Sequence, residues 1–215
     1  SYMTTFKAGK RDITYKEKLD STDNSYNWAE LTYKIFLEKR HGSKFKSLSP
    51  IAKIVWLDGE NRFNKSIDSK FLDLNFDTLF NKNWYSGSDL FLEENRLILG
   101  FEHNYFDTSN GYEIYLSLGR AFFDDKENKL RGDSKQSSYV AELRTTISNK
   151  LSLNGSIEID STLETISRGQ IGITYKKDQR NNIQLRSIYK RLANYLNETS
   201  IWDDADQPIN QLELI

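Results

Sequence analysis

The sequence predicts an all-β protein, and in particular an antiparallel up-and-down transmembrane β-barrel segment. The first observation is the strict alternation of apolar and polar residues from Leu151 to Ile159, which gives an extended chain one apolar and one polar face. The same period of two returns from Asn95 to Tyr105 and from Gly169 to Tyr175. The second observation is that short and long connections between such stretches take turns along the chain.

In order along the chain, the alternating stretches predict about eleven strands. The expected strands cover residues 2–8, 11–19, 26–40, 44–57, 90–106, 111–123, 137–147, 150–160, 166–177, 181–193 and 207–215. Pro50 falls inside the fourth of them and has no N–H to donate, so we expect a bulge or bend there. Helical signals are weak, because the best candidate, Leu192 to Leu196, is too short to matter.

The connections between the expected strands differ in length in a regular way. Tight connections are expected at Gly9-Lys10, 41–43, 107–110, 148–149 and 178–180, and longer ones at 20–25, 58–89, 124–136, 161–165 and 194–206. An outer-membrane barrel has this rhythm, because its periplasmic turns are short and its extracellular loops are longer. A Greek-key sandwich would break the rhythm with a crossover connection.

The composition fits this class of barrel. Mean hydropathy is only −0.69, but a barrel strand exposes just its alternate residues to lipid, so its average hydropathy stays low. The 12 Tyr, 12 Phe and 4 Trp residues supply material for aromatic girdles at the two membrane interfaces. A soluble β-sandwich binding domain would explain these aromatics nearly as well and stays an alternative. The net charge of −1 argues against general nucleic-acid binding.

No catalytic or metal-binding constellation is found in the sequence. The absence of cysteine excludes disulfides and thiol chemistry within this chain. His41 and His103 lack the spacing of a zinc site, and no G-x-S-x-G element is present. The acidic cluster Asp203, Asp204 and Asp206 could bind Ca²⁺ weakly in an exposed loop, but it lacks the glycine and the distal glutamate of an EF-hand loop. The sequence therefore predicts a protein that is not an enzyme and that needs no cofactor or metal.

The polar face of the expected strands carries charges of both signs, which implies water on that side. In a barrel these side chains would face a hydrated lumen. On the outer face of a soluble sheet they would look the same in sequence. The residues expected to face the lumen are Arg96, Glu102, Asn104, Arg168, Gln170, Gln184, Arg186 and Gln211.

A distinctive run of residues lies between positions 71 and 97. It reads Phe71-Leu72-Asp73-Leu74-Asn75-Phe76-Asp77-Thr78-Leu79-Phe80, then Asn83-Trp84-Tyr85-Ser86-Gly87-Ser88-Asp89, then Asn95-Arg96-Leu97. This run resembles the L-D-F-N-x-D-x-L-F, R-F-S-G-x-D-R and N-R-L signature of the lipopolysaccharide-assembly barrel, the LptD (OstA/Imp) family. Leu90 and Trp84-Tyr85 depart from it, since the family usually has Arg and Arg-Phe there. The motif positions are Asp73, Asn75, Asp77, Ser86, Gly87, Asp89, Asn95 and Arg96.

The resemblance implies that residues 1–215 are part of one outer-membrane barrel domain, truncated at both ends. The whole protein would be a translocon in the outer membrane of a Gram-negative bacterium that inserts lipopolysaccharide into the outer leaflet. The partners implied are lipopolysaccharide, an LptE-like plug lipoprotein, outer-membrane lipid, and a periplasmic LptA-like bridge that contacts an N-terminal domain. A general diffusion porin or an autotransporter-type barrel is the other membrane alternative, although an odd number of strands would not close a bacterial barrel.

The connection at 58–89 would then be an extracellular loop. Its apolar content is high for a loop that extends freely into water, since Phe71, Phe76 and Trp84 all fall within it. We therefore expect this loop to pack against the lumen or against other loops.

Overall fold

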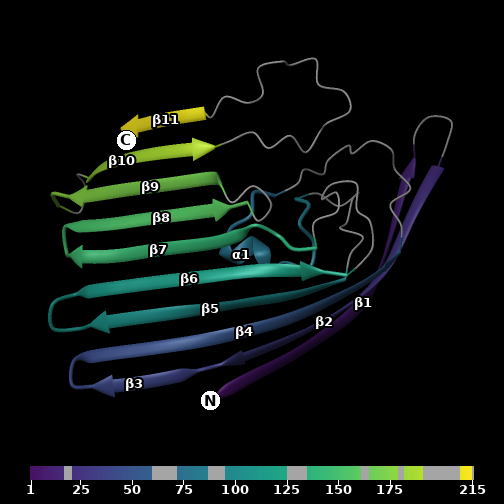
Figure 1. The fold of residues 1–215 in the computed structure, drawn as a ribbon, viewed down its shortest axis with the longest axis horizontal. Helices are drawn as coiled ribbons and strands as arrows, with labels where there is room; N and C mark the ends of the chain where they lie inside the picture. The colour runs from purple at the N-terminus through teal and green to yellow at the C-terminus, as the bar shows by residue number, and fades with distance from the viewer. Residues whose placement is uncertain are drawn as a thin grey trace.

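A computed structural model of the chain describes residues 1–16, 21–59, 72–86, 95–124, 135–160, 165–178, 182–190 and 209–214. Within this part of the chain, one antiparallel sheet of 11 strands is accompanied by one short helix, α1 (Figure 1). The predicted all-β fold is confirmed. The elements are β1 (Tyr2–Lys16), β2 (Ser21–Ile35), β3 (Leu37–His41), β4 (Lys44–Gly59), α1 (Phe76–Leu79), β5 (Arg96–Asp107), β6 (Tyr112–Phe123), β7 (Tyr139–Ser148), β8 (Leu151–Ile159), β9 (Ile166–Lys176), β10 (Asn182–Lys190) and β11 (Ile209–Leu214).

The strands lie in the sheet in the order in which they follow in the chain. The order is β1-β2-β4-β5-β6-β7-β8-β9-β10-β11, with β3 paired to β4 next to β2. Each pairing is antiparallel, as in an up-and-down meander. The sheet is not closed, because β1 lies at one edge and β11 at the other. This arrangement confirms the predicted partial barrel segment.

Tight turns connect the strands at one end of the sheet (Figure 1). His41 pairs with Lys44, so the β3–β4 turn has two central residues, and Gly42 adopts a φ of 58° there. Such turns require a left-handed backbone that glycine adopts at little cost. Gly111, with a φ of 63°, does the same in the β5–β6 turn. The connections after β4 and β6 are longer and begin at the opposite end, which confirms the predicted alternation for these elements.

The predicted tight turn at Gly9-Lys10 is wrong. Strand β1 continues through both residues, with Gly9 paired to Trp28 and Lys10 to Asn27. The strands expected at 2–8 and 11–19 are therefore one strand. The ring of Trp28 explains the glycine, because a Cβ at position 9 would lie 3.0 Å from Trp28 Cζ2. The small residue marks a close approach between side chain and backbone and not a turn. The connection expected at 20–25 is also shorter than predicted, because β2 begins at Ser21.

The expected bulge at Pro50 is also absent. Strand β4 pairs with β5 in continuous register through this residue. The strand paired with β4 is interrupted instead. Phe36 separates β2 from β3 and splits the strand expected at 26–40. Phe36 stays in register with β1, because its N–H donates to the Ser1 carbonyl over 2.7 Å. On the other side, the pairing with β4 stops at Lys34 and Ile51 and resumes at Leu37 and Leu48, so this ladder is interrupted beside Pro50, which has no N–H to donate.

The sheet has two different faces. Because side chains alternate along a strand, paired residues share a face. We call the face against which residues 72–86 pack the inner face. The core lies there, where Leu79 and Trp84 pack on residues from several strands. The strand residues of this core are Tyr26, Val55, Leu57, Ile98, Ala121 and Val140.

The opposite, outer face is apolar and uncovered by any second sheet within the described residues. A β-sandwich would have buried Ile171 and Ile173, but they are 51% and 41% exposed. The large apolar side chains exposed on this face include Phe6, Tyr33, Leu97, Leu99, Leu116, Leu118, Tyr175, Ile183, Leu185, Leu212 and Leu214. No helix in the described ranges is both long and apolar enough to cross a membrane.

Candidate functional site

Residues 72–86, here called the inward segment, connect β4 toward β5 and lie on the inner face of the sheet. Its helix α1 is one turn long and begins with a capping box at Asn75. The Asn75 side chain accepts from the Thr78 N–H over 2.8 Å, and the Thr78 hydroxyl accepts from the Asn75 N–H over 2.8 Å. The Leu72 N–H donates to the Trp84 carbonyl over 2.7 Å, which brings the ends of the segment together. The predicted packing of this loop is confirmed for residues 72–86.

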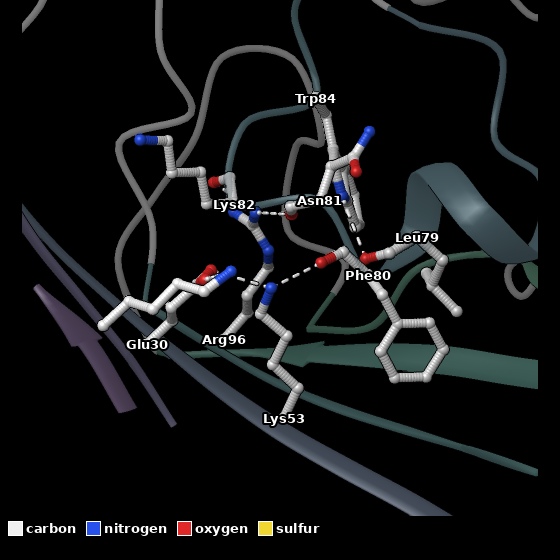
Figure 2. Close-up of polar contacts among 9 residues, drawn as sticks. Glu30, Lys53, Leu79, Phe80, Asn81, Lys82, Trp84 and Arg96 are labelled. Carbon is white, nitrogen blue, oxygen red and sulfur yellow. Dashed lines mark hydrogen bonds and ion pairs between the residues drawn. The ribbon is translucent and has the colours of Figure 1, made fainter. Parts of the chain in front are cut away.

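The apolar side of the inward segment is fully buried. Phe76, Leu79 and Trp84 are each 3% exposed or less. The Trp84 ring meets Phe123 of β6 edge to face, with 5.6 Å between ring centroids. Its indole N–H donates to the Leu79 carbonyl over 3.2 Å, so the one polar atom of the ring is satisfied inside the segment (Figure 2). The tryptophan that departs from the family signature is thus a central anchor of the segment.

Two buried cations hold the backbone at the C-terminal end of α1 (Figure 2). Lys53 Nζ of β4 lies 2.7 Å from Glu30 Oε2 of β2 and donates to the Phe80 carbonyl over 2.6 Å. Arg96 of β5 donates to the Asn81 and Lys82 carbonyls, the first over 2.6 Å. Carbonyls at the end of a helix have no partner within the helix, and cations are favourable there. The burial of Lys53 and Glu30 makes their mutual pairing essential.

Lys82 lies over an aromatic ring at the same end of the segment. Its amine is 3.8 Å from the centroid of the Trp28 ring of β2. Burial lowers the pKa of the Lys82 amine below the ordinary lysine value. Glu30 acts in the opposite direction, whereas the positive charges of Arg11, Lys53 and Lys7 lower the pKa further. The cations around Glu30 therefore outnumber its single carboxylate.

The N-terminal end of the inward segment reaches strands on the other side of the sheet. Asp73 Oδ2 lies 2.7 Å from Arg168 Nη1 of β9, and Asp73 Oδ1 lies 3.3 Å from Lys190 Nζ of β10. The Phe76 N–H donates to Glu142 Oε1 of β7 over 3.0 Å. The segment thus contacts β2, β4, β5 and β6 through one end and β7, β9 and β10 through the other.

The motif residues take different positions around this segment. Asp73 and Asn75 have the roles described above, and Asp77 is exposed in the first turn of α1. Ser86 is exposed at the end of the segment. Asn95 joins β4 to β6, because its side chain accepts from the Leu57 N–H and donates to Asp124, each over 2.9 Å. Gly87 and Asp89 lie outside the described residues.

The eight polar residues expected to share a face do share the inner face. On β5 and β6, Glu102 is opposite Ser117 and Asn104 is opposite Tyr115. Glu102 forms an ion pair with Lys34 of β2. The pairing of Arg168, Gln170, Gln184, Arg186 and Gln211 through β8 to β11 places them on the same side. Arg186 lies 3.6 Å from Glu213, which also accepts from Gln211 over 2.8 Å.

These residues fall into two groups across the inner face, one on β5 and one on β9 to β11. A cavity of about 260 Å³ lies between the inward segment and β7, β8 and β9. It is lined by Leu74, Asn75, Ala141, Glu142, Arg144, Asn154, Gly155, Ser156, Ile157, Glu158, Arg168 and Gln170. The lining is mostly polar, as expected for a surface in contact with water. Among the described residues, no group of three or more acidic or histidine side chains is arranged to hold a metal ion.

Sequence reasoning missed several residues of this site. Glu30, Lys53 and Glu142 were not singled out. Glu30 and Glu142 are charged residues at polar positions of alternating stretches, whereas Lys53 is the one charge in the apolar run from Ile51 to Leu57. Their partners come from distant parts of the chain, up to 66 residues away for Glu142 and Phe76. A charge in such a stretch signals a polar face, but the sequence contains no signal that identifies its partner.

Comparison with known proteins identifies the family. The family model described as LptD, LPS transport system D, matches residues 4–214. The chain belongs to the LptD family. The LptD match covers nearly all of the sheet, including both groups of inner-face residues.

Several curated relatives carry the name LPS-assembly protein LptD. The relative from Idiomarina loihiensis is 26% identical over 160 residues, covering 71% of this chain and 21% of that protein. The relative from Vibrio vulnificus is 24% identical over 207 residues, covering 91% of this chain and 26% of that protein. The relative from Haemophilus ducreyi is 26% identical over 151 residues, covering 67% of this chain and 19% of that protein. The chain therefore spans only about a fifth to a quarter of the length of these LptD relatives.

Proposed function

We propose that this chain is part of the wall of an outer-membrane barrel that inserts lipopolysaccharide into the outer leaflet of a Gram-negative bacterium. The observation that carries the proposal is the LptD family match over residues 4–214, because the family is described as an LPS transport system. In this proposal the chain belongs to one barrel domain that continues beyond it on both sides. The protein acts as a translocon and not as an enzyme.

The apolar outer face supports contact of the wall with lipid. On β4 the outer-face positions from Leu48 to Trp56 carry no charge. Between their ends, the outer-face positions of β5 to β11 carry no Asp, Glu or Lys, and Arg120 is the one arginine. His103 of β5 is a titratable residue on this face. A lipid-facing surface has this composition, since a charge near the bilayer midplane costs about 2–4 kcal/mol. Trp56, Phe122 and Tyr139 near one end, with Tyr112 and Tyr175 near the other, fit aromatic girdles.

Arg120 is the exception, and its surroundings fit a position at the membrane interface. Its guanidinium carbon lies 3.9 Å from the centroid of the Tyr139 ring, and its Nε–H donates to the Ser137 carbonyl over 3.0 Å. Only 9% of the residue is exposed. The charge is therefore covered by an aromatic ring and directed toward a backbone carbonyl at the end of the strand, as is typical of a cation near the headgroups.

The inner face, in this proposal, lines a water-filled lumen. Its charged and amide side chains would contact the sugar head group of lipopolysaccharide as it passes, together with an LptE-like plug lipoprotein. Arg96 lies on the inner face but is covered by the inward segment, so it does not face the lumen as expected from the sequence. The residues proposed to face the lumen are the other seven expected from the sequence, Glu102, Asn104, Arg168, Gln170, Gln184, Arg186 and Gln211. A periplasmic LptA-like bridge would deliver lipopolysaccharide through a part of the protein outside this chain.

Depletion of the full-length protein in its own bacterium tests the function. We expect newly made lipopolysaccharide to stop reaching the cell surface, measured by labelling intact cells from outside. Normal surface labelling after complete depletion would overturn the proposal. Porin-type uptake of a small antibiotic, measured in parallel, distinguishes a diffusion pore, which would lose uptake without losing surface lipopolysaccharide.

Arginine substitutions on the two faces test the orientation. Ile171 and Gln170 are neighbours on β9 that point to opposite faces. We expect I171R to prevent stable insertion of the barrel, at a cost of about 2–4 kcal/mol, and Q170R to be tolerated. Heat-modifiable migration of the full-length protein in membranes reports folding. Equal tolerance of both substitutions would contradict a lipid-facing outer surface.

A further inference from the structure

The two ends of the inward segment are held in different ways. The end that includes Leu79 and Trp84 is buried, with 0% and 3% of these residues exposed. The carboxylate end at Asp73 is open to solvent, with 52% of the Asp73 side chain exposed. Its partners Arg168 and Lys190 are 29% and 44% exposed. Buried contacts resist separation, whereas exposed ion pairs are weak and screened by salt.

The fixed end combines several kinds of contact. Lys53 and Arg96 donate to three successive carbonyls, those of Phe80, Asn81 and Lys82. The guanidinium of Arg96 also lies 4.9 Å from the centroid of the Trp84 ring. Separating this end from the sheet would leave buried charges without partners, which is costly.

The exposed end depends on few contacts. The Asp73 side chain is held by its two ion pairs. On either side of it, the Leu72 N–H donates to the Trp84 carbonyl and the Phe76 N–H donates to Glu142, and Leu74 packs partly buried against the core. The cavity of about 260 Å³ lies beneath this end, with Leu74 and Asn75 of the segment as one wall. The opposite walls are inner-face residues of β7, β8 and β9, including Arg144, Asn154 and Gln170. A movement of residues 73–75 alone leaves Phe76 and Leu79 in the core, so it requires less free energy than release of the whole segment, and it would turn the cavity into a groove.

We propose that residues 73–75 form a strap over the cavity, and that Asp73 is its latch. When Asp73 leaves Arg168 and Lys190, residues 73–75 move away from the sheet while Leu72 and the buried Phe76 on either side stay in place, and the groove along β7 to β9 opens. The same movement frees the two cations on β9 and β10. This device goes beyond the proposed transport function and depends only on contact of the inner face with water, which allows salt to screen the latch.

Hydrogen exchange of the full-length protein in lipid nanodiscs, resolved to residues 73–75 and 76–86, tests the strap. In the D73N variant we expect exchange in 73–75 to rise several-fold while 76–86 stays protected. Raised sodium chloride should have the same effect on the wild-type protein and little further effect on D73N. The matched control is D77N, because Asp77 is also exposed on the segment and has no ion pair among the described residues. Its exchange should equal that of the wild type.

Two results would overturn the strap. If exchange in 73–75 is unchanged in D73N, the aspartate is no latch. If exchange in 73–75 and in 76–86 rises together, the segment has no fixed part. Both results are measured by hydrogen exchange alone. They are therefore independent of the surface-labelling test of lipopolysaccharide transport.

Discussion

Gly100 of β5 and Gly119 of β6 lie directly opposite each other in the sheet, and the side chains of the inward segment rest on both. A Cβ at position 100 would lie 2.9 Å from the Leu118 carbonyl oxygen and 3.0 Å from the Phe80 ring. A Cβ at position 119 would lie 2.7 Å from Leu79 Cδ2. The two glycines remove side chains from the inner face where α1 needs space, so the helix packs close to the backbone of the sheet.

Substitution of Gly100 by alanine should therefore destabilise the folded chain. We expect G100A to cost about 1–3 kcal/mol, because the added methyl group meets backbone and an aromatic ring that have no room to move. The measurement is denaturant unfolding of the full-length barrel in detergent micelles. G155A is the control, since a Cβ at that glycine would have ordinary contact with one atom, the Gln170 carbonyl oxygen at 3.5 Å. Similar losses for the two variants would contradict the role of Gly100.

Removal of the Lys53 charge should destabilise the folded chain, because the buried carboxylate of Glu30 loses its ion pair with Lys53. We expect K53M to cost about 3–5 kcal/mol, because it leaves Glu30 and the Phe80 carbonyl without this donor. The comparison is K7M, since Lys7 lies 3.7 Å from the same carboxylate but is 62% exposed. That variant should lose less than about 1 kcal/mol. The measurement is the free energy of unfolding of both variants under the same conditions. A small loss of stability in K53M would mean that water replaces the lysine as the partner of Glu30.

Trp84 should contribute through its volume and its indole N–H separately. We expect W84A to cost about 3–5 kcal/mol, as for other large buried side chains. W84F should cost less and should include about 1 kcal/mol for the lost hydrogen bond to the Leu79 carbonyl. W56F is the matched control, because Trp56 is 42% exposed on the outer face. If W84F and W56F have equal unfolding midpoints, the hydrogen bond contributes nothing measurable.

The lowered pKa of Lys82 predicts a dependence of stability on alkaline pH. Below its folded-state pKa the amine is protonated in both states, and the folded state bears the full cost of the buried charge. Between the folded-state pKa and the unfolded value of about 10.4, the unfolded chain binds more protons, so stability rises with pH. Unfolding free energies of wild type and K82Q, compared across this window, should show the rise only in the wild type. Parallel curves would exclude the effect.

The inward segment should resist proteases added to intact cells. Phe76, Leu79 and Trp84 are buried and Lys53 holds the Phe80 carbonyl, so residues 76–86 lack the flexibility that cleavage requires. Peptide mapping of the full-length protein after external digestion is the measurement, and heat-unfolded protein provides the positive control. Rapid cleavage within 76–86 on intact cells would contradict a packed segment.

Much of the fold could be predicted from the sequence, because alternation determines which residues share a face of a strand. The apolar outer face of β8 and β9 and the polar inner face that carries Glu102 and Arg168 both follow from this period of two. The errors occurred where a small or cyclic residue had more than one structural explanation. Gly9 is explained by the close approach of the Trp28 ring, and no turn occurs there. Pro50 leaves β4 and its pairing with β5 intact, and the break lies in the ladder between β4 and the strands β2 and β3.

The candidate site was only partly predictable. The motif residues Asp73, Asn75 and Asn95 were found through the family signature, and the burial of their segment was expected from its apolar content. Helix α1 was missed because four residues give no helical period. The partners of Asp73 could not be predicted, because Arg168 and Lys190 come close to it only once the strands are paired in register.

The ion pair between Asp73 and Lys190 joins residues 117 positions apart in the chain. Strand pairing, by contrast, joins strands that are close together in the sequence. The sheet can therefore grow one hairpin at a time at little entropic cost, whereas the Asp73 end of the inward segment can attach only after β9 and β10 are in place. Its attachment is then a late step of folding, and substitutions at Asp73 should speed unfolding while leaving the folding rate almost unchanged.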